Sequence, residues 1–209
     1  IINAGAVTFI SNESERFTIQ PNSSRPLSTL PPGFWVALLV GLFAWLISSA
    51  VFAFRQKEAS AGYLLLSGAA TLTFSPFGAI YATRELAMPE TLFMWLSDGN
   101  FFGGSIFIAS FIALLLCYPK TIGPKWLRPG IVALFTFWFI LQQLDVFSSM
   151  TFARRFLVML GISSTFVLAG IHWFRTRKDP VARAALQWFL ISWMLGTCMF
   201  CLFILLPQM

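Results

Sequence analysis

Six long apolar runs constrain this chain more than any other feature. An α-helix needs about 20 residues, at about 1.5 Å each, to cross a hydrocarbon core of about 30 Å. Hydrophobic residues make up 57% of the 209 residues and charged residues only 11%, which excludes an ordinary soluble domain. The runs occupy residues 34–54, 59–81, 101–118, 129–147, 152–174 and 186–206. They predict an all-α polytopic membrane protein with about six transmembrane helices in a bundle.

The third run has an ambiguous beginning. Residues 91–97 are also apolar, and Asp98-Gly99-Asn100 separates them from the run. This polar triplet either interrupts one long helix or caps a shorter one, because Asp and Asn are favoured N-cap residues. The sequence leaves both alternatives open.

Residues 1–29 have a different pattern. Val7 and Phe9, and then Phe17 and Ile19, alternate with polar residues on either side of a polar turn, which is typical of a β-hairpin. An isolated hairpin is only marginally stable. We therefore expect a short extracytoplasmic hairpin and a linker rich in Ser and Pro, together forming the tail of a larger domain.

The distribution of Lys and Arg predicts how the transmembrane domain, residues 30–209, is oriented, because cytoplasmic loops carry an excess of these residues. One side of the membrane would hold Arg55, Lys57, Lys120, Lys125, Arg128, Arg175, Arg177, Lys178 and Arg183. The other side would hold Arg16, Arg25, Arg84, Arg154 and Arg155. The hairpin is therefore expected outside. The net charge of +6 follows from this rule and from contact with the lipid bilayer, so no nucleic-acid partner is expected.

The last cytoplasmic loop leads into the sixth run. Asp179 is a good N-cap residue and Pro180 suits the first helical position, so the sixth helix should start there. Arg183 and Trp188 would be anchors at the membrane interface. The alternative is that these four residues form a junction that transmits a signal.

This segment also resembles a known family. The pattern Asp-Pro-x-x-Arg-x-x-Leu-x-Trp, from Asp179 to Trp188, is similar to the sensor region of ComP-like bacterial sensor histidine kinases. Residues 114–120 resemble the Leu-rich helix and Phe-Pro-Arg that precede that family's first large cytoplasmic loop, with Tyr118 where Phe is usual. The resemblance implies a sensor in the bacterial cytoplasmic (inner) membrane that is a homodimer in its full-length form. It also implies that the hairpin and linker are the tail of a larger PDZ-like extracytoplasmic domain.

The family's phosphoacceptor histidine segment and ATP-binding boxes do not occur in this sequence, so the chain alone is not expected to be a kinase. Six spans that start outside also end outside. An output domain in the cytosol would therefore need a further span after Met209, and an extracytoplasmic domain before Ile1 would need its own anchor. These spans would bring the total to eight, as in members of the family.

No catalytic residue, metal site or cofactor is predicted. His172 is the only histidine, and no cluster of carboxylates accompanies it to complete a metal-ligand set. No serine lies in a recognisable nucleophile motif with a base to activate it. We expect His172 to be a packed or interfacial residue.

A ligand site is predicted where the extracytoplasmic ends of the second to fifth helices meet. Aromatic walls would come from Trp95 and Phe101, hydrogen-bond acceptors from Asp98 and Asp145, and anion binding from Arg154 and Arg155. Either arginine would bind a ligand carboxylate or pair with Asp145. The alternative is that both arginines hold phospholipid headgroups.

The function expected from these features is a transmembrane sensor that passes a signal from a small or lipophilic extracytoplasmic ligand to a cytosolic output domain. The alternative is a transporter or channel component of the inner membrane, although the spans show few ionisable groups and no clear inverted repeat. The small residues Gly161, Thr165 and Ala169 recur along one face of the fifth helix, which predicts that this helix is central in the bundle.

Overall fold

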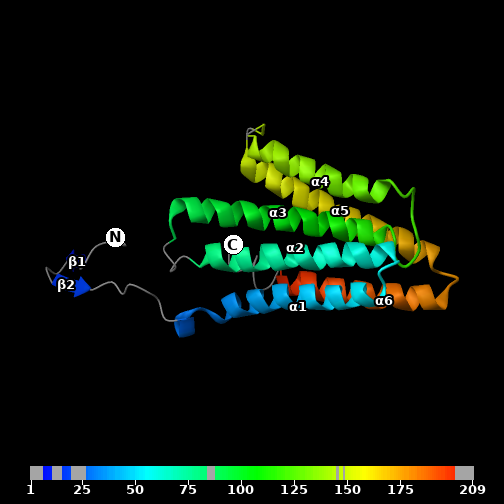
Figure 1. Ribbon diagram of the computed structural model, residues 1–209, viewed down its shortest axis with the longest axis horizontal. Helices are drawn as coiled ribbons and strands as arrows, with labels where there is room; N and C mark the ends of the chain where they lie inside the picture. Colours follow the sequence, from blue (N-terminus) through cyan, green and yellow to red (C-terminus); the bar gives the residue numbers. More distant parts are fainter. Residues whose placement is uncertain are drawn as a thin grey trace.

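A computed structural model describes residues 7–10, 16–19, 27–83, 88–144, 146–147 and 149–200. These residues form six long helices that lie side by side in one bundle (Figure 1). In chain order, the 3-10 turn η1 (Leu27–Thr29) is followed by α1 (Pro32–Phe54), α2 (Ala59–Ala82), α3 (Glu90–Leu115), α4 (Leu127–Gln143), α5 (Met150–Arg175) and α6 (Pro180–Phe200).

Two short strands precede the helices. β1 (Val7–Ile10) and β2 (Arg16–Ile19) pair antiparallel, with Val7 opposite Ile19 and Ile10 opposite Arg16. The turn between them and the linker residues 20–26 lie outside the described residues.

α3 is one continuous helix, so the polar triplet neither interrupts nor caps it. The neighbouring helices satisfy the triplet instead. The Asn100 side chain donates a hydrogen bond to the Phe74 carbonyl of α2 at 2.6 Å, and Asp98 pairs with Arg154 of α5 at 3.0 Å. A polar group inside an apolar helix is stable when another helix supplies its partner.

Several helix ends differ from the predicted runs. α3 ends at Leu115 and α4 at Gln143, before the predicted limits of residues 118 and 147, because apolar residues continue beyond the last hydrogen-bonded turn. α6 begins at Pro180, ahead of the apolar run, as the capping pattern predicts. The predicted end of the sixth run at residue 206 lies outside the described residues.

The helix at the centre of the bundle is α3, so the prediction for the fifth helix is wrong. α3 packs against α2, α4 and α5, and Ala109, Ser110 and Ala113 are fully buried. The predicted small-residue face of α5 is buried, but much of the rest of that helix is exposed. Small residues therefore mark the face of α5 that contacts α3 and not a central position for the whole helix.

α1, α2 and α3 form a closely packed layer. A Cβ atom on Gly68 of α2 would overlap the side chain of Ser48 and lie 2.7 Å from the Ala44 carbonyl oxygen, both in α1. A Cβ atom on Gly103 of α3 would lie 2.9 Å from the Phe74 amide nitrogen of α2. The backbones of this α1–α2–α3 layer approach each other closely because these positions carry no side chain.

α6 is held mainly by aromatic rings. Phe111 of α3 stacks against Phe189 of α6 with ring centroids 5.2 Å apart. Trp193 of α6 meets the ring of Phe166 of α5 edge-on at 4.8 Å and also stacks at 6.4 Å against Phe111. This helix is therefore joined to the bundle through side chains.

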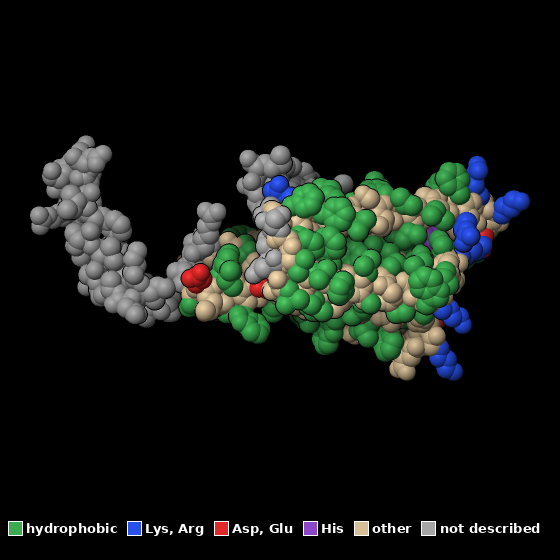
Figure 2. Space-filling view, turned by 90° about the horizontal axis from the view of Figure 1, so that it is seen from above, with side chains coloured by type: hydrophobic (Ala, Val, Ile, Leu, Met, Phe, Trp, Pro, Cys, Tyr) green, Lys and Arg blue, Asp and Glu red, His purple; other side chains and the backbone are tan. Residues whose placement is uncertain are grey.

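The face of the bundle that Figure 2 shows is apolar along its middle and charged at its ends. Val36, Phe43 and Ile47 of α1, for example, are 56–62% exposed, which suits lipid as the surrounding solvent. Four helices, α1, α2, α3 and α5, are long and apolar enough to cross a membrane. α4, with 17 residues, is too short for that criterion, and α6 carries Arg183 and Gln187 in its first turns.

Most of the exposed Lys and Arg side chains in Figure 2 gather at one end of the bundle. This end holds the connections α1–α2, α3–α4 and α5–α6, and we call it the basic end. The opposite end, where α3 and α5 begin, is called the Arg154 end.

Candidate functional site

An ion pair joins α3 and α5 at the Arg154 end. The guanidinium of Arg154 donates hydrogen bonds to Asp98 Oδ1 at 3.0 Å and to Ser97 Oγ at 3.4 Å. It also lies over the ring of Phe101, 5.0 Å from the centroid. Ser97, Asp98, Phe101 and Arg154 together form what we call the Arg154 cluster.

Helical spacing explains how the cluster forms. Asp98 and Phe101 are three residues apart and therefore lie on one face of α3. α5 begins just before the cluster, where Ser149 caps it by accepting a hydrogen bond from the Phe152 amide at 3.3 Å. Arg154 follows the buried Ala153 and can reach α3, whereas Arg155 lies a further 100° around the helix and is exposed.

Unpaired polar atoms gather near the same end. Gln142, at the end of α4, is only 2% exposed, yet neither its Nε2 nor its Oε1 has a hydrogen-bond partner among the described residues. The same holds for Trp138 Nε1 and Arg154 Nε. Leaving a buried polar group unpaired costs about 1–3 kcal/mol, so a further partner for any of these atoms would stabilise this region.

Gln142 lies close to the Arg154 cluster along the bundle. Phe139, one turn before Gln142 on α4, packs against Phe101 and Phe102 of α3, with ring centroids 6.0 and 5.0 Å apart. Phe101 is also the ring beneath the Arg154 guanidinium. The ends of α3, α4 and α5 therefore meet around one aromatic group with polar side chains beyond it.

The structure brings together three of the six predicted ligand-site residues, Asp98, Phe101 and Arg154. Asp98 accepts a hydrogen bond from Arg154, and its predicted role as an acceptor for a ligand stays a prediction. Trp95 is 79% exposed on α3. Arg155 is exposed and makes no hydrogen bond or ion pair with any other described residue. Asp145 lies outside the described residues.

A second polar contact joins α3 and α5 at the basic end. His172 is fully buried, and its Nε2 lies 2.5 Å from the carbonyl oxygen of Leu115, the last residue of α3. A carbonyl can only accept, so Nε2 carries the proton and donates. The hydrogen bond satisfies one of the carbonyls that a helix end leaves free, and His172 is therefore a packed residue.

Asp179 serves two partners at the basic end. Its Oδ1 accepts a hydrogen bond from the Ala182 amide at 3.1 Å, which is the predicted N-cap of α6. Its Oδ2 pairs with Lys120 of the α3–α4 connection at 2.9 Å. These hydrogen bonds, that of Lys120 first, hold the pKa of the Asp179 carboxyl below its usual range.

The other predicted junction residues differ in their contacts. Pro180 is the first residue of α6. The guanidinium of Arg183 lies 4.9 Å from the ring centroid of Trp173, which links α6 to α5. Trp188 is 73% exposed on the surface of α6.

Sequence reasoning missed the partners Leu115 and Lys120. The position of His172 had a signal, because it continues the buried face of α5 three residues after Ala169. Lys120 had none, since its role depends on which helices become neighbours. Gln142 had a signal, because it is a polar residue at the end of an apolar run, close to Gln143 and Asp145.

Among the residues that the structure describes, no group of three or more His, Cys, Asp or Glu side chains is placed to hold a metal ion. The site is instead an ion pair with unpaired polar atoms beside it, linked through α3 and α5 to a hydrogen-bonded junction at the other end. No protein-family model, curated protein or solved structure matches this chain.

Proposed function

We propose that the chain is a membrane sensor domain that crosses the bilayer six times and passes a signal from the Arg154 end to the basic end. In this proposal α4 and α6 also span, the hairpin and the Arg154 end are extracytoplasmic, and the basic end faces the cytosol of a bacterium. The observation that carries it is the pair of polar contacts between α3 and α5, one near each end of the two helices.

Between these two contacts the α3–α5 interface is apolar. A Cβ atom on Gly161 would overlap the side chain of Ile108, and Leu157 is buried against Ala109 and Ile112. Along this apolar stretch no hydrogen bond between described residues joins α3 to α5, so the polar contacts at its two ends are the ones that hold the register. A small rotation or shift of α5 on α3 would therefore change the Arg154–Asp98 pair and the His172–Leu115 hydrogen bond together.

The basic end offers a route from α5 to α6. The Thr176 hydroxyl donates to the His172 carbonyl at 2.8 Å, and the Asp179 amide donates to the Thr176 carbonyl at 3.0 Å. Asp179 then caps α6 and holds Lys120. A movement of His172 would reach the first turn of α6 through these contacts.

The ligand class follows from the chemistry at the Arg154 end. A small molecule with a carboxylate or phosphate would compete with Asp98 for the Arg154 guanidinium. An adjacent donor and acceptor on the molecule would pair with the Gln142 amide. Such a ligand would have a higher affinity for the cluster when the Arg154–Asp98 ion pair is broken than when it is formed. A difference in affinity between two states is what allows a ligand to shift the population from one to the other.

As the resemblance to ComP-like sensor kinases implies, the output would be a two-component histidine kinase that acts as a homodimer. The gene sequence that follows the codon for Met209 tests this part of the proposal. A further span followed by a helical segment with a phosphoacceptor histidine is expected, and an unrelated domain there would contradict the kinase output.

The coupling itself can be tested by hydrogen exchange of the chain in lipid nanodiscs. Arg154→Gln removes the ion pair, so faster exchange is expected in α6 around Ala182 as well as in the first turns of α5. Arg155→Gln is the matched control, because it removes the same charge from the neighbouring exposed position. If Arg154→Gln affects only the Arg154 end, the two ends are not coupled and the sensor proposal fails.

A further inference from the structure

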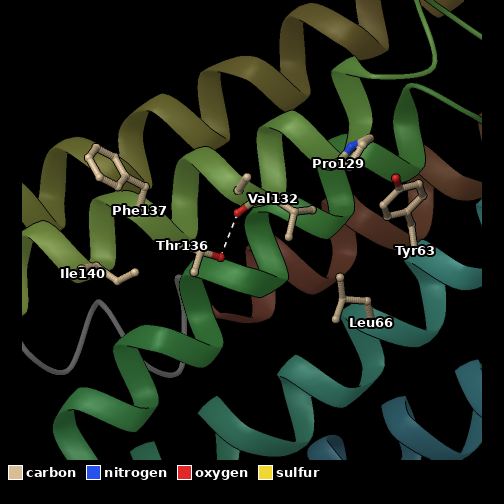
Figure 3. Close-up of a pocket in the computed structure, with 8 residues that line it drawn as sticks. Tyr63, Leu66, Pro129, Val132, Thr136, Phe137 and Ile140 are labelled. Atoms are coloured by element: carbon tan, nitrogen blue, oxygen red, sulfur yellow. Dashed lines mark hydrogen bonds between the residues drawn. The ribbon is translucent and has the colours of Figure 1, made fainter.

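A groove between α2 and α4 opens on the outer surface of the bundle (Figure 3). Tyr63 and Leu66 of α2 form one side, and Val132, Thr136, Phe137 and Ile140 of α4 form much of the other. Its volume is about 450 Å³. The Thr136 hydroxyl donates to the Val132 carbonyl of its own helix at 2.9 Å (Figure 3), so it offers the groove no free donor.

A buried arginine lies at the basic end of this groove. Arg128 is only 9% exposed, and it precedes Pro129, which lines the groove. Arg128 interacts electrostatically with Tyr63, which also lines the groove, and with Cys117 just beyond the end of α3. No hydrogen bond or ion pair joins Arg128 to another described residue, and its Nε is buried without a partner.

A buried cation without a counterion is unfavourable, and a guanidinium is well suited to bind phosphate because its donors form a planar fork. From Pro129 to Ile140, α4 rises about 16 Å at 1.5 Å per residue. This length is close to half of a hydrocarbon core of about 30 Å, the depth of one leaflet. The groove therefore has the length of an acyl chain whose headgroup lies at Arg128.

We propose that the chain binds an anionic phospholipid, with the phosphate on Arg128 and one acyl chain in the α2–α4 groove. Phosphatidylglycerol is the test ligand. The exposed lysines Lys57 and Lys125 at the same end attract anionic lipids without fixing them, whereas the buried Arg128 fixes the position of one headgroup. This inference is independent of the proposed sensor function.

The test measures binding of phosphatidylglycerol to the purified chain in detergent by native mass spectrometry, with phosphatidylcholine as the neutral reference. Arg128→Gln is expected to raise the apparent Kd for phosphatidylglycerol about tenfold, a loss of about 1.4 kcal/mol. Arg177→Gln removes an exposed charge at the same end and is expected to change the Kd by less than about twofold. An equal loss in both variants, or none in either, would overturn the proposal.

A second variant tests the groove and does not depend on Arg128. Ala133→Phe places a ring in the groove and is expected to weaken phosphatidylglycerol binding, while Val36→Phe on the exposed surface of α1 is not. Inorganic phosphate, which lacks acyl chains, should not compete with the lipid. Unchanged binding by Ala133→Phe, or full competition by phosphate, would show that the groove is not the site.

Discussion

The α1–α2–α3 layer and the α5–α6 part of the bundle use different means to hold their helices together. In the layer, Gly68 and Gly103 let one backbone approach another, so any added atom meets a carbonyl or an amide. α5 and α6 are held by side chains: an ion pair, a histidine and aromatic rings that meet stacked or edge-on. A backbone atom in a helix cannot move without moving the helix, whereas a side chain can change its conformation. The α1–α2–α3 layer should therefore be the fixed part of the molecule, and the α5–α6 part should be the adjustable one.

The largest effect is expected for Gly68→Ala. The new methyl group would overlap Ser48 and press on the Ala44 carbonyl, so α1 and α2 must separate, which should cost about 3 kcal/mol, the upper end of the usual range for overpacking. Unfolding of the purified chain in mixed detergent micelles measures the loss. Gly62→Ala is the control, because nothing lies within 4 Å of its added Cβ, and equal stability of the two variants would contradict close packing in the layer.

Trp193→Ala should loosen α6 without affecting the layer. It removes ring contacts with Phe111 and Phe166, each worth roughly 0.5–1.5 kcal/mol beyond its buried area. Hydrogen exchange should become faster in α6 and stay unchanged in α1 and α2. If exchange rises equally in all of these helices, the two regions are one cooperative unit and the comparison fails.

A smaller effect is expected for Gly161→Ala on α5. The three heavy atoms nearest to its new methyl group all belong to the side chain of Ile108, which can move, so the expected loss is about 1 kcal/mol, the low end of the overpacking range. Adding Ile108→Leu removes the branch at Cβ with little change in volume and should restore stability. A loss as large as that of Gly68→Ala, with no recovery in the double variant, would place α5 in the fixed part of the molecule.

The smallest effect concerns the pH dependence of the Asp179 contacts. The pKa of this carboxyl is lowered in the folded chain, so the stability that it contributes is fully present above its ordinary pKa of about 3.9 and is lost as the pH falls through the lower folded value. NMR titration of the Asp179 side chain should give a midpoint below the ordinary value for an aspartate. Lys120→Met should raise that midpoint, whereas Lys125→Met should leave it unchanged; an unchanged midpoint in Lys120→Met would exclude the ion pair in solution.

The sequence predicted where the helices lie along the chain better than it predicted how they pack against one another. The long apolar runs gave the approximate places of the six helices, and Asp179 with Pro180 gave the start of α6, because a cap needs only residues that are adjacent in sequence. The central place of α3 was not predictable from hydrophobic pattern. In lipid, the face that contacts protein and the face that contacts solvent are both apolar, so periodicity does not distinguish them.

Individual residues of the candidate site were predictable from the sequence, but the contacts between them were not. Asp98 and Arg154 stood out because charges are rare in apolar helices, but neither residue indicates its partner. The structure pairs them, and it also places the uncharged Gln142 near them, with no hydrogen-bond partner for its amide among the described residues. The importance of Gln142 comes from its burial, which is a property of the assembled helices.

The Arg154–Asp98 pair has a consequence for the order of synthesis. Its two members are 56 residues apart, which the ribosome translates in roughly 3–11 s at about 5–20 residues per second. During those seconds Asp98 is already made and its counterion is not. A carboxylate is costly in hydrocarbon, so α3 is expected to settle at its final depth only when α5 emerges, and these two candidate spans should then enter the bilayer as one unit.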